Sequence, residues 1–223
     1  IDVDQRVAQQ YPTKRPDGSV PYRILYRASA MYPDGSSFTD HDVHRALKRR
    51  GIPCVGGEWF RCRLDDVKAA VLSVRSRTDN AENRTASFSM RPEQQAAVEK
   101  TENYFRSLSA EDAGRCPKFL WNCKMRFGKT FAAYQLAKRM GLRRVLILTF
   151  KPAAVSAWQE DLNTHLDFEG WQFISRQTQL TYEAADKSRP IVCFGSFQDY
   201  LGVNRETGGI KSKNEWVHAV NWD

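Results

Sequence analysis

The sequence predicts an α/β protein: a parallel sheet with helices on both faces, preceded by a small separate α/β (α+β) domain. Three observations predict it. A polar segment at 76–89 has almost no large apolar groups. After it, strands alternate with helices, a pattern typical of βαβ units and a parallel sheet. A Gly-Lys-Thr loop stands between a strand and a helix in that second part. We therefore expect domains at 1–75 and 90–223, joined by the linker 76–89.

Composition excludes several classes of protein. The chain has 223 residues, 41% of them hydrophobic, enough for a packed core. No apolar run reaches the roughly 18 residues that would span a bilayer, so we expect no membrane partner. The five cysteines are scattered without zinc-site spacing, which predicts reduced thiols, no structural metal and a cytoplasmic location. The chain starts without Met or signal peptide, so we expect a piece of a longer protein.

Net charge favours a polyanionic partner. The formal charge is +8. Residues 1–90 carry 15 basic and 11 acidic side chains and residues 91–223 carry 19 and 15, an excess of +4 in each part. An excess spread over both parts indicates a basic surface, not a basic tail.

The expected elements follow from periodicity and from turn residues. In the first part they are a helix at 2–10, a strand at 22–28, a helix at 40–50 capped by Thr39, a strand at 58–62 and a helix at 64–74. In the second part they are helices at 92–108, 128–140 and 152–166, and strands at 118–122, 144–150, 171–174 and 191–194. We expect the strands at 118–122, 145–150 and 191–194 to be parallel neighbours, with the loop 123–130 at a carboxyl end.

That loop matches the phosphate-binding pattern GxxxxGK[ST], except that a cysteine replaces the first glycine. Its residues are Cys123, Lys124, Met125, Arg126, Phe127, Gly128, Lys129 and Thr130. Backbone N–H groups at the start of the following helix would cradle phosphates. The Lys129 ammonium would reach the β and γ phosphates, and the Thr130 hydroxyl would bind Mg²⁺. The alternative is a chance Gly-Lys-Thr at a helix start.

A second motif lies upstream, where Arg91-Pro-Glu-Gln94 opens a helix. A glutamine amide both donates and accepts hydrogen bonds, which suits it to an adenine edge. Taken alone, a glutamine in the first turn of a helix is usually solvated.

Together these motifs resemble the first RecA-like domain of superfamily 2 helicases, nearest to the restriction-enzyme and phage-type subgroup, over residues 88–223. The resemblance implies a RecA-like P-loop fold that binds ATP and Mg²⁺. It places Arg91 and Gln94 at the adenine, the loop at the phosphates with Lys129 and Thr130 as catalytic residues, and DNA contacts at Thr149, Lys151, Ser196 and Gln198.

The sequence departs from this family at its end. The acidic Asp-Glu box is expected just after Asp223, and the second RecA-like domain is missing. The resemblance therefore implies that hydrolysis needs the remainder of the parent chain, and that this part alone is inactive.

The first part carries a short helix with Arg6, an expected strand at 22–27, the run Asp40-His-Asp-Val-His44 and the run Gly57-Glu58-Trp59-Phe60. In this order they are similar to the back half of a GIY-YIG-like nuclease domain. The similarity implies that Arg6 stabilises phosphate charge, that Asp40 or Glu58 supplies the metal-binding carboxylate, and that His44 is a candidate base. Asp40 could equally be a helix-capping acid, and His44 could simply face solvent.

We thus expect a fragment of an ATP-dependent DNA helicase or translocase with a nuclease-like N-terminal domain, from a restriction, phage-defence or phage-encoded enzyme. The alternatives are another P-loop enzyme, such as a kinase, or a non-catalytic DNA-binding module. Hydrolysis stimulated by DNA would separate the helicase from another P-loop enzyme. ATP binding by a chain extended through the second RecA-like domain would separate it from a non-catalytic module.

Overall fold

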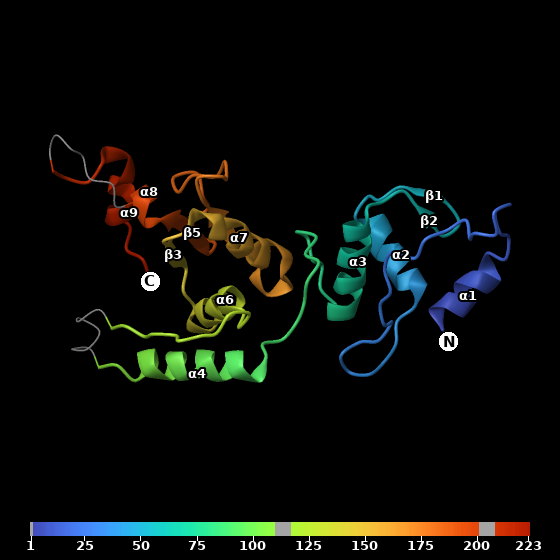
Figure 1. Ribbon diagram of the computed structural model, residues 1–223, viewed down its shortest axis with the longest axis horizontal. Coiled ribbons are helices and arrows are strands. Elements are labelled where there is room, and N and C mark those ends of the chain that lie inside the picture. The colour runs from blue at the N-terminus through green and yellow to red at the C-terminus, as the bar shows by residue number, and fades with distance from the viewer. Residues whose placement is uncertain (1, 110–116, 201–207) are drawn as a thin grey trace. The chain divides into compact units, whose positions relative to one another are not determined.

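The computed structural model describes residues 2–109, 117–200 and 208–223 (Figure 1). The chain forms two compact units, Ile1–Thr85 and Ala86–Asp223. The boundary between them lies inside the polar segment 76–89. That segment is itself packed, since Asn80 is only 1% exposed and Arg84 only 3%. The Asn80 amide donates to the carbonyl of Ala69 at 3.2 Å and so ties the segment to a helix of the first unit.

The first unit is a helical pair with a small hairpin. Its elements are α1 (Val3–Gln10), α2 (Asp40–Arg49), β1 (Cys54–Gly56), β2 (Trp59–Phe60) and α3 (Leu64–Ser76). Thr39 caps α2 in a capping box with Asp42, as the sequence predicts. The core lies between α2 and α3, where Ala46 and Leu47 pack with Ala70.

The predicted strand at 22–28 is wrong. Those residues have no regular structure, and Leu25 and Tyr26 are 61% and 37% exposed. A strand is stabilised by cross-strand pairs, and no strand of the described first unit lies alongside this run. The strand predicted at 58–62 shortens to β2, which pairs antiparallel with β1.

The second unit is built on a parallel sheet of three strands in the described ranges. These are β3 (Arg144–Thr149), β4 (Gln172–Ile174) and β5 (Ile191–Ser196), in the order β3-β5-β4. Both pairings are parallel, with Val192 of the central strand opposite Val145 and Phe173. The expectation that the strands near 145–150 and 191–194 are parallel neighbours is confirmed.

Alternate residues of the central strand face two separate cores. Val192 and Phe194 join the α6 and α7 side, with Phe131, Tyr134 and Leu162. Ile191 and Cys193 face the other side, where Trp216 and Trp222 pack against them. Burial raises the pKa of the Cys193 thiol to about 12, so it is an un-ionised core group. The sheet is therefore covered on both faces.

The remaining elements of the second unit are helical. They are α4 (Pro92–Arg106), α6 (Lys129–Met140), η1 (Pro152–Ala154), α7 (Val155–Thr164), η2 (Leu166–Phe168), α8 (Phe197–Tyr200), η3 (Ser212–Asn214) and α9 (Glu215–Ala219). Helices α4 and α6 run side by side (Figure 1). Within the described ranges, no helix is both long and apolar enough to cross a bilayer.

The predicted strand at 118–122 is also wrong. This run has no regular structure, and Leu120 is 87% exposed. The Trp121 indole N–H donates to the Thr101 hydroxyl at 2.6 Å. That bond anchors the run to α4. The loop 123–130 therefore follows an irregular segment and not the strand that was expected before it.

Candidate functional site

The backbone of the loop 123–130 is bent sharply just before α6. Gly128 occupies the cap position of that helix with φ +78°, and Arg126 also has a positive φ of 63°. The Phe127 N–H donates to the carbonyl of Lys124 at 3.4 Å and closes a turn. Because Gly128 has no side chain, it cannot cap α6, and in the part of the chain that the structure describes no side chain accepts from the first N–H groups of this helix. Such groups are the usual donors to an anion.

Two side chains from the start of α4 hold this loop. Gln94, 5% exposed, donates through Nε2 to the carbonyls of Phe127 at 2.8 Å and Gly128 at 3.3 Å. Its Oε1 accepts the Arg91 N–H at 2.8 Å. Arg91 in turn donates through Nη2 to the carbonyl of Arg126 at 2.9 Å and to that of Phe127. The two predicted adenine-binding residues thus contact the predicted phosphate loop, and an adenine-reading role stays a prediction.

The lysine of the loop folds back onto its own backbone. Lys129 Nζ donates to the carbonyls of Cys123 at 3.3 Å and Lys124 at 3.1 Å. These bonds are exposed to solvent, so a phosphate could compete for the ammonium without breaking a buried contact. Thr130 is half-buried in the first turn of α6, and Met125 is 90% exposed.

A cavity of about 360 Å³ lies at the carboxyl ends of the three parallel strands. It is lined by segments that follow each strand, among them Pro152 after β3, Gln177 after β4 and Gln198 after β5. Crevices of this kind are the usual ligand sites of open α/β sheets. Of the four predicted DNA contacts, Ser196 and Gln198 line this cavity.

The other two predicted DNA contacts, Thr149 and Lys151, lie at the end of β3. The Thr149 hydroxyl accepts the Lys151 N–H at 3.1 Å, and the Lys151 side chain is exposed. Thr149 pairs with Ser196 across β3 and β5. The four candidates therefore share one edge of the sheet.

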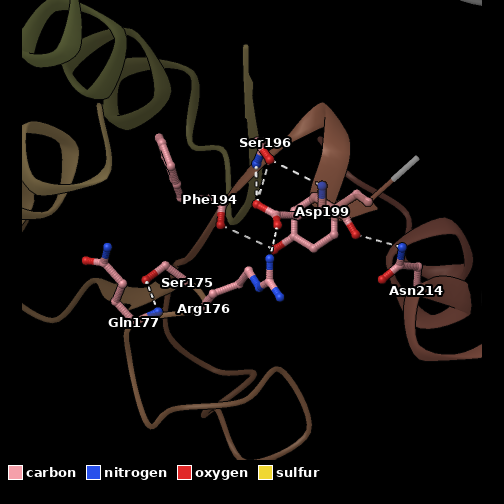
Figure 2. Close-up of polar contacts among 8 residues, drawn as sticks. Ser175, Arg176, Gln177, Phe194, Ser196, Asp199 and Asn214 are labelled. Atoms are coloured by element: carbon pink, nitrogen blue, oxygen red, sulfur yellow. Dashed lines mark hydrogen bonds and ion pairs between the residues drawn. The ribbon is translucent and has the colours of Figure 1, made fainter. Parts of the chain in front are cut away.

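Sequence reasoning missed the polar cluster that organises this edge, which Figure 2 shows. Asp199 accepts the Ser196 N–H at 2.9 Å and the Ser196 hydroxyl at 2.7 Å, and it pairs with Arg176. Burial opposes ionisation of Asp199, but these hydrogen bonds and the guanidinium outweigh it, so the pKa of Asp199 is lowered. The Ser-x-x-Asp spacing of a capping box could have revealed the turn, although nothing nearby in the sequence indicates Arg176.

Ser196 consequently has a structural role in the described state. It is 1% exposed, and its hydroxyl is engaged by Asp199. The ring of Tyr200 covers Gly195 so closely that a Cβ there would lie 2.1 Å from it. Of the two predicted contacts on this segment, the exposed one is Gln198.

The candidates of the first unit are spread over three elements. Arg6 is exposed on α1, Asp40 is the first residue of α2, and Glu58 is exposed in the turn between β1 and β2. His44 is half-buried, with its ring 5.3 Å from that of Phe60 on β2. Among the described residues of this unit, no hydrogen bond or ion pair joins Arg6 to Asp40 or Glu58, and neither of the cavities of about 640 and 270 Å³ in the unit is lined by any of the three. Among the described residues, no three His, Cys, Asp or Glu side chains lie together as a metal site would need.

Comparison with known proteins gives one restriction-related relative. The chain is 37% identical over 123 residues to a Mycoplasma pneumoniae protein described as "Putative type II restriction enzyme and methyltransferase RM.MpnORF110P C-terminus". The match covers 54% of this chain and 16% of that protein. No family model matches the chain. No solved structure matches it either.

Proposed function

We propose that this chain is part of a DNA restriction system, and that its second unit is the nucleotide-binding half of an ATP-dependent DNA helicase or translocase. The restriction-related relative supports the first statement. The second rests on the loop 123–130, because its geometry meets the needs of a phosphate group. On the same resemblance, the first unit would be nuclease-like, with Arg6 and Asp40 or Glu58 as its active residues.

The residues of the loop fit the phosphates of a nucleoside triphosphate. The start of α6, which has no side-chain cap from Gly128, supplies N–H donors, and Lys129 supplies a cation that the exposed carbonyls of Cys123 and Lys124 hold. Gln94 and Arg91 fix the loop carbonyls and so orient the donors. Mg-ATP, when bound, would supply the energy-yielding phosphoryl bond. In this chain, Lys129 would bind phosphate oxygens and the Thr130 hydroxyl would bind the magnesium ion.

The direct test is a melting curve with and without Mg-ATP. Saturation at 100 times the dissociation constant should stabilise the chain by about 2.7 kcal/mol. Lys129→Ala should remove that shift. In the absence of ATP its melting temperature should stay near that of the wild type, because its lost hydrogen bonds are exposed.

Lys100→Ala is the matched control, since it removes the same charge from an exposed position of the same unit, on α4 and outside the loop. It should keep most of the shift. If Mg-ATP does not raise the melting temperature of the wild type, the loop is not a nucleotide site and the helicase proposal is wrong. In the full-length protein, hydrolysis stimulated by DNA and not by a small metabolite would exclude a kinase.

A further inference from the structure

The first unit contains a basic cavity that lies apart from its candidate nuclease residues. Its volume is about 640 Å³, and it lies where the last turns of α2 meet the end of α3. Four lining side chains are cationic, and two, Asp42 and Asp79, are anionic, which leaves a surplus of two positive charges. The cations are Arg45, Lys48, Arg49 and Arg77.

Local structure makes these cations converge. Arg45, Lys48 and Arg49 are three and four residues apart on α2, which places them on one face of the helix. Arg77 follows α3 in a left-handed conformation with φ +54°. Its guanidinium lies 4.2 Å from the centre of the Tyr32 ring and pairs with Asp34 at 2.8 Å. The helix α2 and the residue that follows α3 thus supply positive charge to one cavity.

Part of this charge is not neutralised by the protein. Arg45 pairs with Asp42, whose pKa is lowered chiefly by the Thr39 backbone N–H and then by the Thr39 hydroxyl. Lys48 and Arg49 are exposed, and among the described residues no carboxylate lies within ion-pair distance of either. Basic residues in a last turn do complement the helix dipole. That effect explains their position on α2 but not the convergence of Arg77 from α3.

The walls of the cavity are held in place. The Arg50 guanidinium donates to the carbonyls of Asp79 at 3.4 Å and Asn80 at 3.3 Å, which ties α2 to the segment after α3. The Ser73 hydroxyl donates to the carbonyl of Thr78 at 2.5 Å. A ligand would therefore meet a largely preformed surface, which lowers the entropic cost of binding.

We propose that this cavity binds the backbone phosphates of double-stranded DNA. Lysine and arginine are the usual partners of phosphate, and arginine can bind it through two parallel hydrogen bonds. The high exposure of the Arg45 and Arg77 side chains, 74% and 61%, places charge at an open rim that a long polyanion can reach. None of Arg6, Asp40, His44 and Glu58 lines it. The choice of DNA over a small phosphate rests on the proposed function.

The experiment measures binding of the 223-residue chain to a fluorescent duplex of about 20 base pairs from 50 to 200 mM salt. We expect Lys48→Gln/Arg49→Gln to weaken binding roughly tenfold or more at 100 mM, and to lower the salt slope by about 2. Lys14→Gln/Arg15→Gln removes the same charge from exposed positions of the same unit and should leave both nearly unchanged. The swap Lys48→Arg/Arg49→Lys should retain binding, which also shows that these positions tolerate substitution.

Three outcomes would overturn the inference. The cavity variant could bind DNA as the wild type does, or the control could lose as much as the cavity variant. Inorganic tripolyphosphate could raise the melting temperature through Lys48 and Arg49 while the duplex does not bind, which would make this a small-anion site. The Mg-ATP shift, measured on the same samples, separates the two proposals. If Mg-ATP still raises the melting temperature but Lys48→Gln/Arg49→Gln binds the duplex as the wild type does, only this inference fails. If Mg-ATP gives no shift but that variant loses duplex binding, only the nucleotide site is overturned.

Discussion

At the scale of single residues, Gly128 couples the loop to α4. Its φ of +78° is costly for any residue with a Cβ. An added Cβ would also lie 2.5 Å from Nε2 of Gln94, which is buried and hydrogen-bonded to the loop. Gln94 would have to move and give up those bonds. We therefore expect Gly128→Ala to lower the free energy of unfolding by about 2–3 kcal/mol, measured by urea denaturation.

Gly141 is the control for this substitution. It ends α6 with a similar φ of +71°, but nothing lies within 4 Å of an added Cβ. Gly141→Ala should therefore cost only the backbone strain, about 1–2 kcal/mol. Equal losses for the two variants would show that Gln94 does not hold the loop in solution.

Asp199 should contribute to stability in an acid-sensitive way. Its folded-state pKa lies below the ordinary value of 3.8, so the contribution is fully present above about pH 3.8. It is lost as the pH falls through the lower folded value, when protonation weakens the bonds from Ser196 and Arg176. Asp199→Asn should flatten the acid limb of the stability curve below pH 4, as measured by thermal melts from pH 2 to 7. An unchanged acid limb would contradict this assignment.

Sequence reasoning selected candidate residues by the chemistry of their side chains, and it missed those that act through tertiary contact. Gly128 and Gln94 were both predicted, and the structure places them in contact. Arg176 and Asp199 were not predicted, because they are 23 residues apart and only the adjacency of β4 and β5 brings them together. One sequence alone does not indicate that two residues so far apart in the chain lie in contact.

At the scale of elements, α6 is stabilised by the face that it turns to the sheet. Phe131 is 3% exposed and packs in the core with Phe168 and Val192. Phe131→Ala should therefore cost about 3–5 kcal/mol of unfolding free energy. Leu120→Ala removes a side chain that is 87% exposed and should change the value by less than about 0.5 kcal/mol. Urea denaturation measures both, and comparable losses would mean that 118–122 is packed after all.

The strands that were predicted correctly pair with a neighbouring strand in the structure. The two runs that were wrongly predicted as strands have no such neighbour among the described residues. The central strand β5 is buried along its whole length, and its apolar run is unambiguous. The runs at 22–28 and 118–122 also contain apolar and aromatic residues that favour strands, yet the first has exposed apolar side chains and the second is anchored to α4 by Trp121. Strand formation depends on pairing, which local propensity does not encode. Helices keep their hydrogen bonds within the segment, so their existence was predicted better.

At the scale of the whole chain, the structure describes two units that each bury their own core. Leu47 lies in the core between α2 and α3, and Leu162 lies in the core beneath the parallel sheet. Within the described ranges, each of these cores consists of residues of its own unit. A two-state unfolding free energy is therefore expected for each unit and not for the whole chain, and the values given above for Gly128, Gly141, Phe131, Leu120 and Mg-ATP refer to the second unit.

We expect each core to control the opening of its own unit only. Leu47→Ala leaves a cavity between α2 and α3 and should cost about 2–5 kcal/mol within residues 2–85, and Leu162→Ala should cost a similar amount within 86–223. Hydrogen exchange followed by mass spectrometry resolves this peptide by peptide, because protection reports the local free energy of opening. Leu47→Ala should speed exchange in α2 and α3 and leave β3 and β5 unchanged, with Leu162→Ala giving the converse. Faster exchange in both units from either substitution would show that the two units unfold as one.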